Sequence, residues 1–194
     1  GTHVGKRDLD DPAIEAVLRK FSWGRMFIFR PIRVLAGESW GYDNGAYRDW
    51  QAQRPFDEVA YARRTELAAL AGTPLLAVLP DIVGKGRRSL DFSMRWIDKM
   101  PPTWPLYLAV QDGLTVAEVK PLLKDKISGI FLGGTDPFKS SARAWCVAAH
   151  AAHPTLGGAL TVLCAHQVPR EEHGSGAGSG SGSGLAQQRF DRIL

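Results

Sequence analysis

The sequence predicts an α/β fold in which parallel strands alternate with helices. Several short apolar runs are apolar on both faces, which is typical of parallel strands that are covered by helices. Helical patterns lie between these runs, so strand and helix follow each other in a regular order. The predicted strands are the runs at 2–5, 25–29, 39–44, 74–81, 105–112, 128–134 and 159–166.

Each predicted helix carries its own sequence signals. Segment 11–21 begins with an aspartate that is followed by proline, the residue favoured at the first helical position. Segment 115–125 begins at Thr115, and Glu118 three residues later completes a capping box. The stretch 30–38 lacks a helical period and is expected to be a loop. The other helices are predicted from apolar residues three and four apart, at 56–70, 87–100 and 141–153.

Polar and glycine residues at the strand ends favour a closed barrel over a doubly wound sheet. In an eight-stranded (β/α)8 barrel of the TIM type, the C-terminal strand ends converge on one mouth, whereas an open sheet spreads them apart. Such barrels usually need about 250 residues. With 194 residues we expect a compact barrel that is incomplete at its last helix–strand unit. The strand-end residues are Asp43, Asp81, Gln111, Asp112, Gly133 and Gly134.

The chain is expected to divide into a barrel domain at 1–173, a linker-like segment at 174–184 and a C-terminal helix at 185–194. The middle segment consists almost entirely of glycine and serine. A parallel crossover needs at least about 10–12 residues, and too few lie between the seventh predicted strand and this segment for it to be an eighth strand. The C-terminal helix is expected to dock through Leu185, Phe190, Ile193 and Leu194.

The composition is that of a globular protein, with 44% hydrophobic and 23% charged residues. A net charge of +4 permits a nucleic-acid partner. No run is long enough to span a bilayer and no secretory signal pattern is present, so a cytoplasmic protein without a membrane partner is expected. Cys146 and Cys164 lie in apolar surroundings and are expected to be buried thiols in a reducing compartment. No CxxC or HxxxH spacing occurs, so neither a metal nor another cofactor is expected.

Two aspartates follow predicted strands in settings that suit a flat ligand. Asp43 lies in "YDNGAY", which is also an ordinary turn sequence, but Trp40, Tyr42 and Tyr47 suggest an aromatic-lined pocket around it. Asp81 ends the strand in "LPDIVG". A carboxylate there can cap the next helix, or it can accept hydrogen bonds from paired N–H groups such as the N1 and N2 edge of guanine.

The next two strand ends offer further contacts to a purine. Gln111 in "AVQDG" could donate a hydrogen bond to a purine O6, and Asp112 is either a turn residue or a second carboxylate of the site. Gly133 and Gly134 in "FLGGTDPFK" let the backbone approach a ligand closely because glycine has no Cβ.

The order "YDNGAY", "LPDIVG", "AVQDG" and "IFLGGTDPFK" resembles the queuine tRNA-ribosyltransferase superfamily over roughly residues 3–168. It is most similar to the short phage and bacterial relatives that are linked to 7-deazaguanines in DNA. The resemblance implies a barrel enzyme, a pentosyltransferase, that exchanges guanine for a 7-deazaguanine base at C1′ of a nucleotide. The structural zinc ligands of the tRNA enzymes are missing, so the chain is expected to bind no zinc and to lack the usual tRNA-clamping subdomain. The resemblance to the short relatives implies DNA rather than tRNA as the partner.

The resemblance also implies roles for individual residues. Asp43 would act catalytically near the leaving and entering base. The family's nucleophile is an aspartate on the last strand, but the best match here, 176–184, has Gly178 and Ser181 at the two aspartate positions. Asp112 is therefore the second catalytic candidate, with Asp136 in reserve. The substrate-binding candidates are Asp81, Gln111, Gly133, Gly134 and, from the aromatic surroundings of Asp43, Tyr42.

Three functions stay open at the level of sequence. The first is a base-exchanging transglycosylase, which needs one carboxylate at C1′ and one to manage the proton of the base. The second is an N-glycosidase, a hydrolase in which water replaces the incoming base in the same pocket. The third is a non-catalytic module that binds a purine-like base, which the missing aspartates favour.

Overall fold

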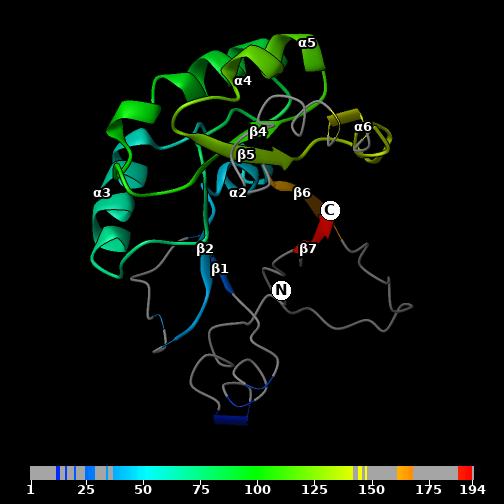
Figure 1. Ribbon diagram of the computed structural model, residues 1–194. Helices are drawn as coiled ribbons and strands as arrows, with labels where there is room; N and C mark the ends of the chain where they lie inside the picture. The colour runs from blue at the N-terminus through cyan, green and yellow to red at the C-terminus, as the bar shows by residue number, and fades with distance from the viewer. Residues whose placement is uncertain are drawn as a thin grey trace, which may run out of the picture.

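The computed structural model describes residues 25–28, 34 and 37–141, the strands 161–167 and 188–193, and single positions at 12, 13, 16, 20, 144, 145 and 147. At its centre is a seven-stranded sheet in which neighbouring strands follow the order of the chain (Figure 1). The strands are β1 (Arg25–Phe27), β2 (Trp40–Tyr42), β3 (Leu76–Val78), β4 (Leu106–Val110), β5 (Ile127–Leu132), β6 (Thr161–Gln167) and β7 (Gln188–Ile193).

Strands β1 to β6 are each parallel to the next. This confirms the predicted α/β fold, and it confirms the predicted strands from 25–29 onwards. The run at 2–5 lies outside the described residues. Strands β1 and β7 stand at the two ends of the strand order, so the described strands do not close into a complete eight-stranded barrel.

The C-terminal segment departs from its prediction. Strand β7 pairs antiparallel with β6, so the prediction of a helix at 185–194 is wrong. A segment this short is marginal as an independent helix. The edge of β6 offers a row of unpaired backbone N–H and C=O groups, and an added strand satisfies them. The expected linker at 174–184 lies outside the described residues.

The stretch 37–141 contains the α-helices α2 (Ala46–Gln51), α3 (Glu58–Ala69), α4 (Gly86–Met94), α5 (Val116–Val119) and α6 (Asp136–Lys139), and the 3-10 helices η2 (Ile97–Lys99) and η3 (Lys120–Leu122). Helices α3, α4 and α5 confirm the predictions at 56–70, 87–100 and 115–125, and Thr115 and Glu118 form the predicted capping box. The short helices α2 and α6 were not predicted. Within the described residues, no helix is long and apolar enough to cross a membrane.

Helices α3, α4 and α5 lie over the same face of the sheet (Figure 1). Tyr61, Leu90 and Val119, one from each helix, share a fully buried cluster with Leu108 of β4 and Ile130 of β5. Helices on one face and strands in chain order suit a (β/α) barrel-type arrangement, because a doubly wound sheet carries helices on both faces.

The opposite face of the sheet has a smaller apolar cluster. Along β4, Leu108 faces the helices, whereas Tyr107 and Ala109 join Val78 and Phe131 on the other side. Successive side chains of a strand point to opposite faces, so a strand that is buried on both sides reads as a continuous apolar run. Because these strands are parallel, the polar residues that follow them lie at the same rim of the sheet.

The variant Leu108→Ala should lower the free energy of unfolding by about 2–5 kcal/mol, because it leaves a cavity at a fully buried site. Leu70→Ala is the matched control. It removes the same atoms from a side chain that is 85% exposed, so a change within about 0.5 kcal/mol is expected. Urea denaturation measures both values, and equally small effects would contradict the central position of β4.

Candidate functional site

A pocket of about 400 Å³ lies at the C-terminal ends of β2 to β5. Its wall is completed by side chains from α2 and α6, the short helices that follow β2 and β5. This volume is within the usual range of small-molecule sites. Of the seven residues predicted for the site, the lining includes Asp43, Asp81, Gln111, Asp112, Gly133 and Gly134.

Tyr42 is the predicted site residue that does not line the pocket. Its side chain is buried on the helix-covered face of the sheet, where its hydroxyl lies 3.2 Å from the hydroxyl of Thr65 and its ring packs against Tyr61 and Trp104. The structure therefore does not place Tyr42 in the pocket, and its role in substrate binding stays a prediction. Side chains alternate along a strand, so Tyr42 shares the face of Trp40, two residues before it.

Asp81 is held at the pocket by two amide side chains. Asn44 donates through Nδ2 to Asp81 Oδ1 at 2.9 Å and to the backbone oxygen of Leu79 at 2.7 Å. Gln111 donates through Nε2 to Asp81 Oδ2 at 3.3 Å. An ionised carboxylate can accept about four hydrogen bonds, so Asp81 keeps acceptor capacity for a ligand.

The side-chain amide of Gln111 is fully engaged within the protein. Its Nε2 also lies 2.8 Å from the Ser89 hydroxyl and 3.0 Å from the Ile82 carbonyl, so its two N–H groups are shared among three acceptors, of which Asp81 is the most distant. Its Oε1 accepts a hydrogen bond from the Gly84 N–H at 2.6 Å. The predicted contact from Gln111 to a purine would require one of these bonds to be exchanged. In the geometry described here, Gln111 positions Asp81 and the loop between β3 and α4.

Burial dominates the protonation of two carboxyl groups in the pocket. Loss of solvation raises the pKa of Asp81 from 3.8 to about 7; the hydrogen bond from Asn44 opposes this rise and the neighbouring Asp43 adds to it. Loss of solvation also raises the pKa of Asp43, against the hydrogen bonds it accepts from the backbone N–H groups of Gly45 and Asn44. At neutral pH Asp81 is therefore close to its midpoint and can either donate or accept a proton.

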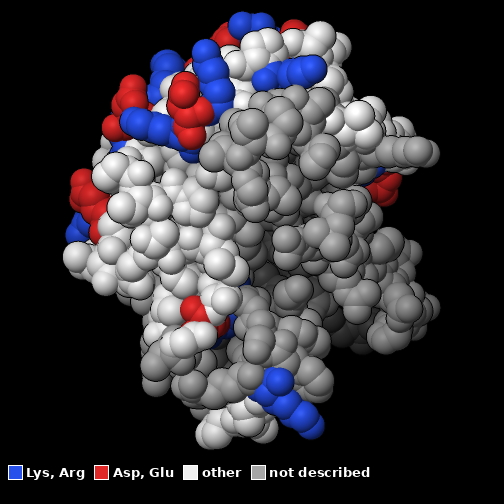
Figure 2. Space-filling model, in the orientation of Figure 1, with Lys and Arg blue, Asp and Glu red and all other residues white. Residues whose placement is uncertain are grey.

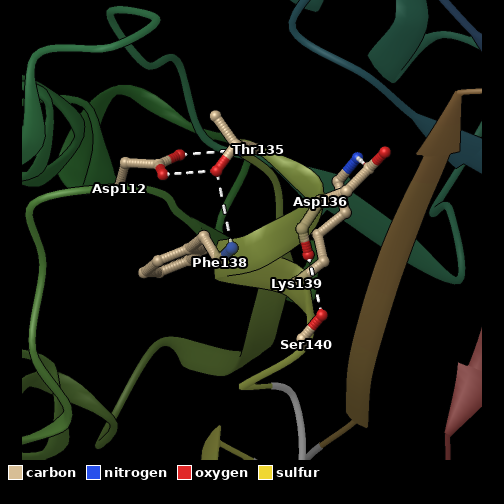
Figure 3. A network of polar contacts seen from close by, with 6 residues as sticks. All are labelled: Asp112, Thr135, Asp136, Phe138, Lys139 and Ser140. Atoms are coloured by element: carbon tan, nitrogen blue, oxygen red, sulfur yellow. Dashed lines mark hydrogen bonds and ion pairs between the residues drawn. The ribbon is translucent and has the colours of Figure 1, made fainter.

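The third carboxyl group, Asp112, has the opposite electrostatic environment. Its Oδ1 accepts a hydrogen bond from the Thr135 hydroxyl at 2.6 Å, and its Oδ2 accepts one from the Thr135 N–H at 2.7 Å (Figure 3). Burial acts to raise the pKa of Asp112, but these bonds and the nearby charge of Lys139 outweigh it, so the pKa is lowered. Asp112 is ionised at neutral pH.

Glycine at position 134 makes this arrangement of Asp112 possible. Gly134 has φ of 81°, and a Cβ built there would lie 2.3 Å from Asp112 Oδ2. Next to it, the Gly133 N–H donates to the Val110 carbonyl at 2.8 Å. Gly134 therefore brings its backbone close to the Asp112 carboxylate, and the approach of the two glycines to a ligand stays a prediction.

Asp136 and Lys139 form the outer part of the same polar network (Figure 3). The Lys139 ammonium lies 3.1 Å from Asp136 Oδ1, and the lysine side chain is only 8% exposed, whereas that of Asp136 is 90% exposed. Asp136, the reserve candidate for catalysis, thus projects into solvent at the rim and pairs with a buried cation.

The structure adds residues that sequence reasoning missed. Thr135 could have been found, because a threonine two residues before a proline signals a helix N-cap, and its hydroxyl lies 3.4 Å from the Phe138 N–H. Trp50 lines the pocket with Tyr47. The spacing of residues along the helix does not by itself show that Trp50 faces the pocket. Nothing in the local sequence around Ser89 indicates its bond to Gln111.

The described residues contain no cluster of three or more histidine, cysteine, aspartate or glutamate side chains placed to hold a metal ion. Comparison of the chain with family models, curated proteins and solved structures finds no match. What can be inferred about the chemistry of the pocket therefore comes from its own residues.

Gly134→Ala should displace the Asp112 carboxylate from Thr135, because the added Cβ would occupy the space of Oδ2. The pKa of Asp112, followed by carbon-13 NMR, is expected to rise toward its ordinary value. Gly37→Ala is the control, since its φ of 77° imposes similar backbone strain with no atom within 4 Å of the new Cβ. An unchanged Asp112 pKa in Gly134→Ala would contradict the close approach.

Asp81 should make the stability of the protein fall with rising pH. The pKa of Asp81 is higher in the folded than in the unfolded protein, so the folded state favours the protonated form. The contribution of Asp81 to the free energy of unfolding is therefore complete below about pH 4 and is lost as the pH rises through about 7. The slope from this group is at most about 1.4 kcal/mol per pH unit, and Asp43 adds to it in the same direction. Urea denaturation between pH 4 and 8 should show a shallower fall in Asp81→Asn.

The control for this pH profile is Asp98→Asn, which removes a carboxyl group that is 90% exposed and paired with Lys126 on the surface. This variant should keep the wild-type slope. A slope that is identical in Asp81→Asn and wild type would show that Asp81 titrates at its ordinary pKa.

Proposed function

We propose that the protein is a transglycosylase that exchanges guanine for a 7-deazaguanine base in nucleic acid, with DNA as the polymer. One observation carries this proposal: of the carboxyl groups that line one pocket, Asp43 and Asp81 have a raised pKa and Asp112 has a lowered pKa. Carboxyl groups whose environments separate their pKa values are suited to different roles in one reaction.

Asp112 has the properties required next to C1′. Cleavage of an N-glycosidic bond develops positive charge on the sugar, and an ionised carboxylate stabilises that charge or bonds to the carbon. Both Asp112 oxygens are oriented by Thr135, and Gly134 leaves them room. We propose that Asp112 takes the role for which the sequence around 176–184 offers only Gly178 and Ser181.

Asp81 and Asp43 have the properties required near the base. With a pKa of about 7, Asp81 is partly ionised at neutral pH, and the ionised form suits the N1–H and N2–H donors of guanine. Asn44 and Gln111 fix its orientation. The buried Asp43, which also lines the pocket and has a raised pKa, gives a proton to the departing base and takes one from the entering base.

The arrangement of the sheet supports the same proposal. We propose that strands β1 to β6 belong to a compact (β/α)8-type barrel whose regular order ends at β7. Strands in chain order, helices on one face and polar residues at one rim are the features of such barrels, whose sites lie at the C-terminal strand ends. The order of the four motifs, which resembles the queuine tRNA-ribosyltransferase superfamily, agrees with it.

The test is an exchange assay with labelled guanine and DNA that contains guanine. Wild-type protein should incorporate the label and should replace guanine with 7-deazaguanine. Asp112→Asn should lower the exchange rate by about 100-fold or more, because it removes the charge next to C1′. Asp81→Asn should lower it by a similar factor and should remove the dependence on a group with a pKa near 7.

Asp98→Asn is the matched control and should exchange at the wild-type rate, since it changes an exposed carboxyl group outside the pocket. Release of guanine without incorporation would identify an N-glycosidase in place of a transglycosylase. Binding of the base without release or exchange would identify a binding module and would overturn the catalytic proposal.

A further inference from the structure

Trp50 is a large aromatic side chain that the fold leaves at the rim of the pocket. It lies on α2, lines the pocket and is 53% exposed. The other described tryptophans, Trp40, Trp96, Trp104 and Trp145, are only 3–4% exposed. In the described part of the chain, the fold therefore buries its indole rings in the core everywhere except beside the candidate site.

The ring of Trp50 is supported from one side. Its centroid lies 5.5 Å from that of Tyr47, with 32° between the two planes, and Tyr47 also lines the pocket. The Tyr47 hydroxyl accepts a hydrogen bond from Gln51 Nε2 at 3.3 Å, which ties it to the same helix. Two aromatic rings on one short helix thus lie next to each other in the lining of the pocket, and Trp50 is the more exposed of the two.

Cationic side chains lie near these aromatic residues and near the pocket loop in the sequence. Arg48 on α2 is exposed, and Lys85 follows the pocket residue Gly84. Arg54, shortly after α2, has a side chain that is 62% exposed and pairs with Asp49 at 2.9 Å. Figure 2 shows acidic and basic side chains interspersed over one face of the molecule. An aromatic surface next to cations is the combination that binds single-stranded nucleic acid.

We propose that Trp50 stacks on the unpaired base next to the nucleotide in the pocket, and that the substrate is therefore single-stranded DNA rather than a free nucleotide or a duplex. The pocket, at about 400 Å³, has the size for a single nucleotide unit, which leaves the ring at its rim for the neighbouring unit. A base within a duplex is already stacked on both sides and cannot lie on Trp50 without unstacking.

This inference rests on the proposed function for the identity of the polymer, and it is tested by binding alone. The probe is a fluorescently labelled single-stranded thymidine oligomer with one central guanine, followed by fluorescence anisotropy. Stacking contributes about 1–3 kcal/mol per base, so Trp50→Ala should weaken binding of the oligomer by about 10-fold or more. Trp50→Phe should retain most of the affinity because it keeps an aromatic face.

Val59→Ala is the control, since it truncates an apolar side chain that is 81% exposed on α3, away from the pocket lining. It should bind the oligomer as wild type does. Free guanine, measured by calorimetry, should bind Trp50→Ala and wild type equally, which also shows that the variant is folded. The same oligomer annealed to its complement should bind wild type more weakly than the single strand.

Equal affinity of Trp50→Ala and wild type for the oligomer would overturn the inference. An equal loss of oligomer and free guanine would also overturn it, because Trp50 would then belong to the base pocket itself. Preference for the duplex would overturn the single-stranded assignment. If the protein binds the oligomer through Trp50 but exchanges no base, the stacking role of Trp50 stands and the proposed transglycosylase function fails.

Discussion

The side-chain amide of Gln111 is the interaction on which the rest of the site depends. It lies at the end of β4, is 4% exposed and bonds to three parts of the chain: Asp81, the loop at Ile82 and Gly84, and Ser89 on α4. A buried amide that lost these partners would be left with unsatisfied polar atoms, which is costly in an apolar interior. The loop after β3 is therefore held in one position, and the carboxylate at its start is held with it.

The contrast between the carboxyl groups follows from how each strand end is covered. Asp43 is buried and Asp81 is half-buried on the β2 and β3 side, and loss of solvation is the main cause of their raised pKa values. Asp112, one strand further along, receives two hydrogen bonds from the turn after β5, and these decide its charge. Neighbouring strands of one sheet thus provide carboxyl groups whose pKa values are shifted in opposite directions.

Much of this organisation could be predicted from the sequence, because parallel strands buried on both faces and polar strand ends are local patterns. Six predicted site residues line one pocket for that reason. Tyr42 could not be placed, since a continuous apolar run does not say which face each side chain takes. The strand at 188–193 was missed because its partner, the edge of β6, is remote in sequence and is invisible to a local pattern. Trp50 and Ser89 act only through tertiary contacts.

The reversal of direction at β7 has a topological consequence for the rim of the sheet. Strand β6 ends at Gln167 on the side where the pocket lies, and its antiparallel partner begins opposite, at Gln188. The chain therefore re-enters the sheet at the rim where β6 ends, whereas a helical crossover between parallel strands would bring it back at the far end of the sheet. Strand β7 consequently presents its N-terminal end, and not its C-terminal end, at the rim that carries the pocket.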